Sequence, residues 1–162
     1  MLEIRRFRTE DQAAVKNLIL DGLAEHWGRL DRSKNPDLND IASSYAGATF
    51  LVAWLDGKIV GSGALKPHDA QTAEVVRMSV DKTLRRQGIG RAVLQALISE
   101  ARAGGFQRVI LETTAAWEEV VRFYLDFGFH ITHYQDEDVY FVLELSQTLS
   151  KENTYERTAQ NL

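Results

Sequence analysis

The sequence RRQGIG at residues 85–90 stands between two segments of opposite periodicity. Residues 73–80 before it mix β-branched and long side chains, which indicates a core strand. Residues 89–101 after it place apolar side chains on one face of a helix, and the glycine pair at 104–105 ends that helix. A glycine- and arginine-rich turn therefore joins a strand to a helix at the centre of the chain.

This turn has the composition of an anion-binding site. The first backbone N–H groups of a helix have no partner within the helix and bear a partial positive charge. Gly88 and Gly90 allow a phosphate to approach the backbone closely, while Arg85, Arg86 and Arg91 add donors that suit phosphate oxygens. The expected ligand is a diphosphate, although a simple helix start with solvated arginines has the same composition.

Two nucleotide-binding motifs are excluded at the turn by their own residue requirements. A Walker A loop ends in Gly-Lys-Ser or Gly-Lys-Thr, and neither occurs here. A dinucleotide-binding fingerprint requires a third glycine at the position that Val93 occupies. The diphosphate therefore belongs to another class of ligand.

The remaining chain alternates between strand and helix patterns. About seven segments are rich in β-formers, namely residues 2–7, 49–55, 58–65, 73–80, 108–112, 131–135 and 139–145. About four have the spacing of an amphipathic helix, namely a segment starting at a Thr9–Gln12 capping box and ending near Trp27, then residues 36–45, 89–101 and 117–125. Asp56-Gly57 predicts a type I′ hairpin turn between the second and third strands.

This order of elements predicts an α/β fold with a mixed, mostly antiparallel sheet and helices on both of its faces. A length of 162 residues suits one core. We expect one domain over residues 1–146, followed by a polar, aperiodic tail over residues 147–162.

Composition excludes several classes of protein. The absence of cysteine rules out disulfides, thiolate metal sites and a cysteine nucleophile. A net charge of −4, from 19 basic and 23 acidic residues, argues against a nucleic-acid partner. No apolar run approaches the ~18 residues of a membrane span, and the first residues lack a signal-peptide pattern. We expect a cytoplasmic protein without a metal or a membrane partner, as a monomer or a homodimer.

The turn and its surroundings resemble the GNAT superfamily of acyl-CoA-dependent N-acetyltransferases. The signature of that family, Arg/Gln-x-x-Gly-x-Gly/Ala, is matched at Arg85, Gly88 and Gly90. Residues 74–80 before the turn, and the pairs Phe-Tyr at 123–124 and Gly-Phe at 128–129 after it, follow in the order of the family. The resemblance covers most of the chain and implies the GNAT fold.

The resemblance also implies a co-substrate and a way of holding it. Acetyl-CoA would donate an acetyl group to a primary amine of a small molecule or a protein, by direct attack in a ternary complex. A bulge in the strand at residues 73–80 would leave the backbone of Met78, Ser79 and Val80 to hold the pantetheine arm like an added strand. The sheet would open between this strand and residues 108–112. The turn would bind the pyrophosphate with Arg85, Arg86, Gln87, Gly88, Ile89, Gly90 and Arg91.

Catalytic roles follow from the chemistry and from the resemblance together. An alkylammonium has a pKa of about 10.4, so a base or a water chain must remove a proton before the amine attacks. Glu74 matches the catalytic glutamate of some relatives. His26 and Glu112 are alternative proton acceptors on segments that border the amine in the family. Tyr124 matches the general acid that protonates the leaving thiolate.

Two other interpretations remain open for the same residues. A non-catalytic acyl-CoA sensor or interaction domain would keep the phosphate-binding turn without turnover. An acyltransferase that uses a different acyl-CoA would keep both the turn and Tyr124. Trp117 departs from the family, because many relatives have at this position an asparagine that contacts CoA.

Overall fold

The computed structural model describes residues 1–28 and 34–145, whose contacts form two compact units. Unit 1 contains Met1–Pro67 and Val75–Glu100, and unit 2 contains His68–Glu74 with the described residues from Ala101 onward. Strand β4, Thr72–Val80, contributes to both units. The predicted tail at 147–162 lies outside the described residues, and the single domain over 1–146 stays a prediction.

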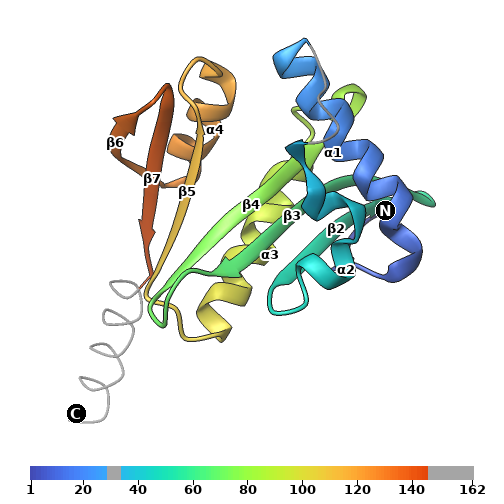
Figure 1. The fold of residues 1–162 in the computed structure, drawn as a ribbon, viewed down its shortest axis with the longest axis horizontal. Helices are drawn as coiled ribbons and strands as arrows, with labels where there is room; N and C mark the ends of the chain where they lie inside the picture. The colour runs from blue at the N-terminus through green and yellow to red at the C-terminus, as the bar shows by residue number, and fades with distance from the viewer. Residues whose placement is uncertain (29–33, 146–162) are drawn as a thin grey trace, which may run out of the picture. The chain divides into compact units, whose positions relative to one another are not determined.

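Unit 1 places helices on both faces of its strands. In Figure 1, α1 and α2 lie on one face of β2, β3 and β4, and α3 lies on the other. Its elements are β1 (Leu2–Arg6), η1 (Thr9–Asp11), α1 (Gln12–Trp27), η3 (Pro36–Asn39), α2 (Ile41–Ser44), β2 (Thr49–Leu55), β3 (Lys58–Pro67), the second part of β4, η4 (Lys82–Leu84) and most of α3 (Ile89–Ala103).

Unit 2 consists of strands with one helix packed against them. Its elements are the first part of β4, then β5 (Arg108–Thr114), α4 (Glu118–Phe127), β6 (His130–Gln135) and β7 (Asp138–Glu144). The ring of Tyr124 in α4 lies 5.7 Å from that of Phe141 in β7, centroid to centroid, which fixes the face of the sheet that α4 covers.

The strands form a seven-stranded sheet in the order β1-β2-β3-β4-β5-β7-β6. The pairs β1–β2, β2–β3, β5–β7 and β6–β7 are antiparallel, and β4–β5 is parallel. The predicted mixed, mostly antiparallel sheet is therefore confirmed. The hairpin prediction is also confirmed, because Asp56 and Gly57 have φ values of 49° and 82°, as a type I′ turn requires.

The start of α1 differs from the prediction of a capping box at Thr9 and Gln12. The Asp11 carboxylate instead accepts a hydrogen bond from the Arg8 backbone N–H at 2.8 Å. The Gln12 side chain bonds to the Leu38 carbonyl at 2.7 Å and to the Ile41 N–H at 2.9 Å. A contact distant in the sequence therefore overrides the local cap.

The helix predicted over residues 36–45 is divided into η3 and α2. Asp40 separates them with φ −148° and ψ 85°, outside the helical region. Its side chain accepts a hydrogen bond from the Ser43 N–H at 3.1 Å and so caps α2. Aspartate satisfies the backbone at a helix start better than in a helix interior, which explains the break.

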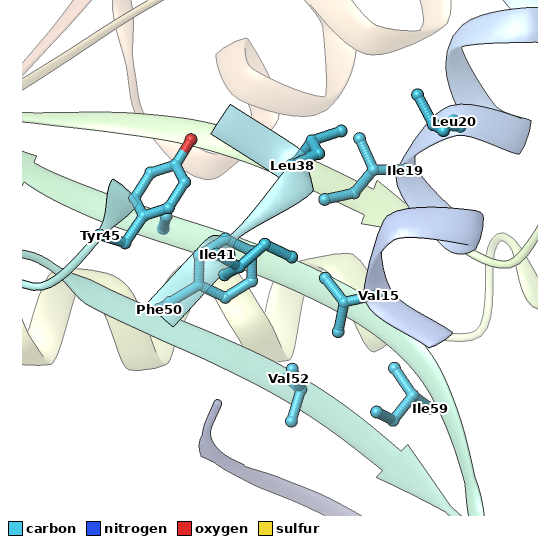
Figure 2. Close-up of a cluster of buried hydrophobic side chains, with 10 residues drawn as sticks. Val15, Ile19, Leu20, Leu38, Ile41, Tyr45, Phe50, Val52 and Ile59 are labelled. Atoms are coloured by element: carbon cyan, nitrogen blue, oxygen red, sulfur yellow. The ribbon is translucent and has the colours of Figure 1, made fainter. Parts of the chain in front are cut away.

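The segment containing η3 and α2 is anchored in the core of unit 1. Figure 2 shows its side chains Leu38, Ile41 and Tyr45 packed with Val15 and Ile19 of α1. Leu38 and Ile41 are completely buried. Each fully buried aliphatic side chain contributes about 1.5–3 kcal/mol of hydrophobic stabilisation, so this short segment has a fixed position.

The opposite face of β3 meets α3 at Gly63. A Cβ atom at Gly63 would lie 2.6 Å from Met78 Sδ, 2.8 Å from Val93 Cγ1 and 2.9 Å from Leu97 Cδ1. Cβ contacts below 3.0 Å essentially do not occur in proteins. Glycine is therefore required here for close packing of the helix on the sheet.

We predict that Gly63→Ala lowers the free energy of unfolding by about 1–3 kcal/mol, because overpacking displaces core side chains. Gly47→Ala is the matched control, since a Cβ at Gly47 has no heavy atom within 4 Å. Urea unfolding of both variants measures the difference. Equal stability of the two variants would contradict the packing observed at Gly63.

Candidate active site

The backbone of β4 is distorted at Arg77. This residue has a φ of 56°, in the left-handed region that non-glycine residues rarely adopt. The left-handed conformation costs a non-glycine residue about 1–2 kcal/mol, and within a strand it marks a β-bulge. The Arg77 carbonyl accepts a hydrogen bond from Oγ of the buried Ser62 at 2.8 Å. β4 therefore contains a bulge of the kind that the family resemblance implies.

The side chain of Arg77 is held as firmly as its backbone. Its Nε lies 3.0 Å from Asp37 Oδ2, and its Nη2 lies 2.7 Å from Asp37 Oδ1 and 3.1 Å from Asn35 Oδ1. Asp37 Oδ2 also accepts a 2.6 Å hydrogen bond from the Tyr45 hydroxyl. We call these four residues the Arg77 clamp.

The ionisation of the clamp follows from its hydrogen bonds. Burial opposes the charge on Asp37, but the hydrogen bonds from Arg77 and Tyr45 hold the pKa of its carboxyl below the ordinary value. Burial, together with donation to Asp37, raises the pKa of Tyr45 to about 12. At neutral pH, Asp37 is charged and Tyr45 is protonated. Sequence reasoning missed this cluster, because Arg77 and Asp37 are 40 residues apart and no local pattern links them.

The residues after the bulge point their side chains to opposite faces of β4. Met78 packs toward α3, where its sulfur approaches Gly63. Ser79 faces α1, and its Oγ lies 3.0 Å from the position of a Cβ at Gly22. Both side chains are half-buried against elements of unit 1, which leaves the backbone of residues 78–80 as the candidate ligand-binding part.

Asp81 fixes the end of β4, where the chain leads into residues 85–90, which we call the signature turn. Its N–H donates to the Val60 carbonyl at 2.8 Å, and its carboxylate accepts hydrogen bonds from the N–H and Oγ1 of Thr83 at 2.9 and 2.7 Å. Lys58 Nζ lies 3.4 Å from Asp81 Oδ2. Hydrogen bonds from Thr83 lower the pKa of the Asp81 carboxyl, which keeps it charged near neutral pH.

The signature turn leaves open space over its glycine. Arg86 and Gly88 have positive φ values of 63° and 83°, and α3 begins directly afterwards at the buried Ile89. A Cβ placed on Gly88 would meet no heavy atom within 4 Å. Gly88 is therefore required by its backbone conformation and not by protein packing. A ligand can approach the N-terminal amides of α3 at this point.

The first signature residue, Arg85, is already paired in this structure. Its Nη1 and Nη2 lie 2.8 and 2.7 Å from the two carboxylate oxygens of Glu25 in α1. The hydrogen bond from Arg85 lowers the pKa of Glu25. Both side chains are more than one-third exposed, so the pair contributes only about 0–1 kcal/mol. Arg85 therefore links the turn to α1, while Arg86 and Arg91 are exposed.

Tyr124 lies in an aromatic cluster of unit 2. Its ring centroid is 5.1 Å from that of Phe123, 5.8 Å from that of Phe129 and 5.7 Å from that of Phe141. Burial raises its pKa well above the ordinary value, so the phenol stays protonated at neutral pH. The Tyr124 side chain is buried, with 6% of the residue exposed.

The candidate bases differ in their surroundings. Glu74 is half-buried and lies opposite Ile110, at the end of the three residue pairs that join β4 to β5. Its carboxylate forms no ion pair or hydrogen bond that the structure shows within the described residues. Glu112 is exposed and accepts a hydrogen bond from Tyr140 that raises the pKa of that phenol. His26 is exposed in the last turn of α1.

The chain belongs to the GNAT family of acetyltransferases. The sequence model of the Acetyltransferase (GNAT) family matches residues 13–129, which is well over half of the chain and includes the signature turn and Tyr124. The resemblance stated from the sequence is therefore confirmed, and the chain is classed with the acetyltransferase enzymes.

Sequence relatives have corresponding names. An uncharacterized N-acetyltransferase of Escherichia coli, YjgM, is 27% identical over 139 residues, covering 81% of this chain and 83% of that protein. Human N-acetylaspartate synthetase is 32% identical over 126 residues, covering 75% of this chain but only 41% of the relative. This chain thus matches less than half of the length of the human enzyme.

Solved structures share the fold. An acetyltransferase of Staphylococcus aureus Mu50 has a TM-score of 0.81 at 21% identity, over 90% of this chain and 99% of its own. PaiA N-acetyltransferase of Thermoplasma acidophilum, in complex with coenzyme A, has a TM-score of 0.79 at 17% identity over the same shares. YncA of Salmonella typhimurium, with acetyl-CoA, has a TM-score of 0.73 at 20% identity, over 90% of this chain and 94% of its own.

None of the helices within residues 1–28 and 34–145 has the length and apolar character needed to cross a membrane. The same residues contain no group of three or more His, Cys, Asp or Glu side chains arranged to hold a metal ion.

Proposed function

We propose that this chain transfers an acetyl group from acetyl-CoA to a primary amine of a small molecule or a protein. The observation that supports this most strongly is the open space over Gly88 at the N-terminus of α3, directly after a strand with a bulge at Arg77. Coenzyme A and acetyl-CoA, which PaiA and YncA bind, present a pyrophosphate and an extended amide-containing arm that suit these two features.

In this proposal the pyrophosphate lies against the amides of residues 88–91. Arg86 and Arg91 supply positive charge from exposed positions, and Gln87 and Ile89 contribute backbone N–H groups. Arg85 either leaves Glu25 and binds a phosphate oxygen, or stays paired with Glu25 and keeps the turn attached to α1. The backbone of Met78, Ser79 and Val80 bonds the pantetheine arm.

The proposed reaction is a direct transfer in a ternary complex. Glu74 accepts a proton from the ammonium, directly or through water, and the neutral nitrogen attacks the thioester carbonyl carbon. The tetrahedral intermediate then collapses, the C–S bond breaks, and the sulfur leaves as a thiolate. Tyr124 donates a hydrogen bond to this sulfur. The nitrogen gives up a second proton, which reaches the thiolate directly or through water, and the acetyl group remains on nitrogen as an amide.

The raised pKa of Tyr124 defines its role more closely. A thiol has a pKa near 8.5, far below that of the buried phenol. Full proton transfer from Tyr124 before the C–S bond breaks is therefore unfavourable. Tyr124 instead donates a hydrogen bond that strengthens as negative charge develops on sulfur.

The acceptor is proposed as an amine on the basis of the names of the relatives. N-acetylaspartate synthetase and N-acetyltransferase 8B are named for N-acetylation. His26 and Glu112 are proposed to line the amine site, with His26 as an alternative base.

The remaining proposals are a cytoplasmic location, a monomer or homodimer, and the absence of a metal, a nucleic-acid partner or a membrane partner. A non-catalytic acyl-CoA sensor and an enzyme for another acyl-CoA are the alternatives.

Acetyl-CoA should raise the melting temperature, because a ligand that binds only the native state stabilises it. Gly88→Glu should abolish this shift through bulk and charge repulsion. Gly105→Glu is the matched control, because Gly105 has a similar φ of 79° and equally open space but lies after α3.

No shift for the unaltered chain at millimolar acetyl-CoA would overturn the proposal. A shift without thiol release across a panel of amines would favour the sensor, and a larger shift with longer acyl-CoAs would favour another donor.

Tyr124→Phe should lower kcat by about 10²- to 10³-fold, the usual loss for one hydrogen-bond donor aimed at developing charge, with little change in acetyl-CoA affinity. Phenylalanine keeps the ring that packs against Phe123, Phe129 and Phe141, so the variant should fold normally. Steady-state thiol release together with the acetyl-CoA-induced melting shift separates the two effects. Unchanged kcat would remove Tyr124 from the mechanism.

Glu74→Gln should move the pH–rate profile to higher pH, because the reaction then depends on amine that is already neutral in solution. The profile of kcat/KM for a simple alkylamine between pH 6 and 10 measures this. An identical profile for the variant would leave water or His26 as the base.

A further inference from the structure

Arg77 combines a strained backbone with a highly ordered side chain. Glycine is the residue that suits a left-handed position in a bulge. An arginine therefore remains in this conformation only because other contacts hold it. Ser62 holds the carbonyl, while Asp37 and Asn35 hold the guanidinium.

Asp37, the main partner of Arg77, stands next to core residues of unit 1. Asp37 belongs to η3, whose neighbouring Leu38 is completely buried in the core of unit 1, as is Ile41 at the start of α2. Gln12 bonds the backbone of both residues from α1. The clamp therefore connects the bulge to the rigid core and not to a movable loop.

The conformation of Arg77 determines the direction of the chain that follows. Peptide groups are planar, so the torsions at Arg77 orient the C=O and N–H groups of the next residues. Those residues are Met78, Ser79 and Val80, whose side chains occupy the two faces of the strand. Any ligand bonded to their backbone depends on the angle set at Arg77.

We propose that Arg77 is a positioning residue for acetyl-CoA: its ion pair with Asp37 holds the bulge so that the backbone of Met78 to Val80 is placed to bind the pantetheine arm. This inference rests on the proposed function. It assigns to Asp37 and Arg77 an effect on co-substrate affinity, without contact with the reacting atoms.

The chain contains a matched control for this clamp. Arg5 Nη1 and Nη2 lie 2.7 and 3.0 Å from the two carboxylate oxygens of Asp11, in the same unit. This pair is at least as buried as the Arg77–Asp37 pair. It joins β1 to the start of α1 and has no bond to β4. Loss of either aspartate leaves a part-buried arginine without its carboxylate.

The test measures the acetyl-CoA dissociation constant by isothermal titration calorimetry, and the melting temperature without ligand, for Asp37→Ala and Asp11→Ala. Both variants should melt at lower temperature. Asp37→Ala should weaken acetyl-CoA binding by about tenfold or more, whereas Asp11→Ala should stay within about twofold of the unaltered chain. If Asp37→Ala does not fold, Asp37→Asn replaces it, with an expected weakening of about threefold.

Substitutions at Arg77 separate the clamp from the backbone strain. Arg77→Ala removes the clamp and keeps a residue that resists positive φ, whereas Arg77→Gly removes the clamp and accepts that φ. Acetyl-CoA affinity should therefore fall more in Arg77→Ala than in Arg77→Gly. The reverse order would overturn the proposed role of Arg77.

Two other results would overturn the inference. The first is a lower melting temperature of Asp37→Ala with acetyl-CoA affinity within about twofold of the unaltered chain, which assigns the clamp to stability alone. The second is equal loss of affinity in Asp11→Ala. An unaltered chain that does not bind acetyl-CoA would overturn the proposed function first and the inference with it, so the two failures are distinguishable.

Discussion

The left-handed conformation of Arg77 is the constraint on which the candidate site depends. A residue of this kind costs about 1–2 kcal/mol, which is a sizeable share of the 5–15 kcal/mol that separates folded from unfolded states. Ser62 and Asp37 offset this cost with a hydrogen bond to the carbonyl and an ion pair to the guanidinium. Met78 and Ser79 place their half-buried side chains on opposite faces of β4, and the bulge interrupts the regular strand just before them.

The signature turn is the second backbone feature on which the candidate site depends. Arg86 and Gly88 reverse the chain with positive φ, and Asp81 fixes its entry through bonds to Val60 and Thr83. The consequence is a helix start with open space over Gly88, beside the exposed Arg86 and Arg91. The Arg85 guanidinium is paired with the Glu25 carboxylate, while Arg86 and Arg91 are exposed at the turn.

Much of this architecture follows from local sequence. Alternation and helical spacing predict the strands and helices, and Asp56-Gly57 predicts its hairpin, because these features depend on neighbouring residues. The break at Asp40, the cap made by Asp11 and the left-handed Arg77 depend on partners far along the chain. Gln12, for example, forms a capping pattern with Thr9 in the sequence but bonds instead to residues 38 and 41. The family resemblance locates the bulge, whereas the ion pair that holds it is visible only in three dimensions.

Hydrogen–deuterium exchange with and without saturating acetyl-CoA tests the central claim most directly, because amides that become bonded to a ligand exchange more slowly. We expect slower exchange in two short stretches, residues 78–80 after the bulge and residues 88–91 at the start of α3, with smaller changes in β1 and β2. Saturated binding without protection at either stretch would contradict the account, because acetyl-CoA would then be held by other parts of the chain.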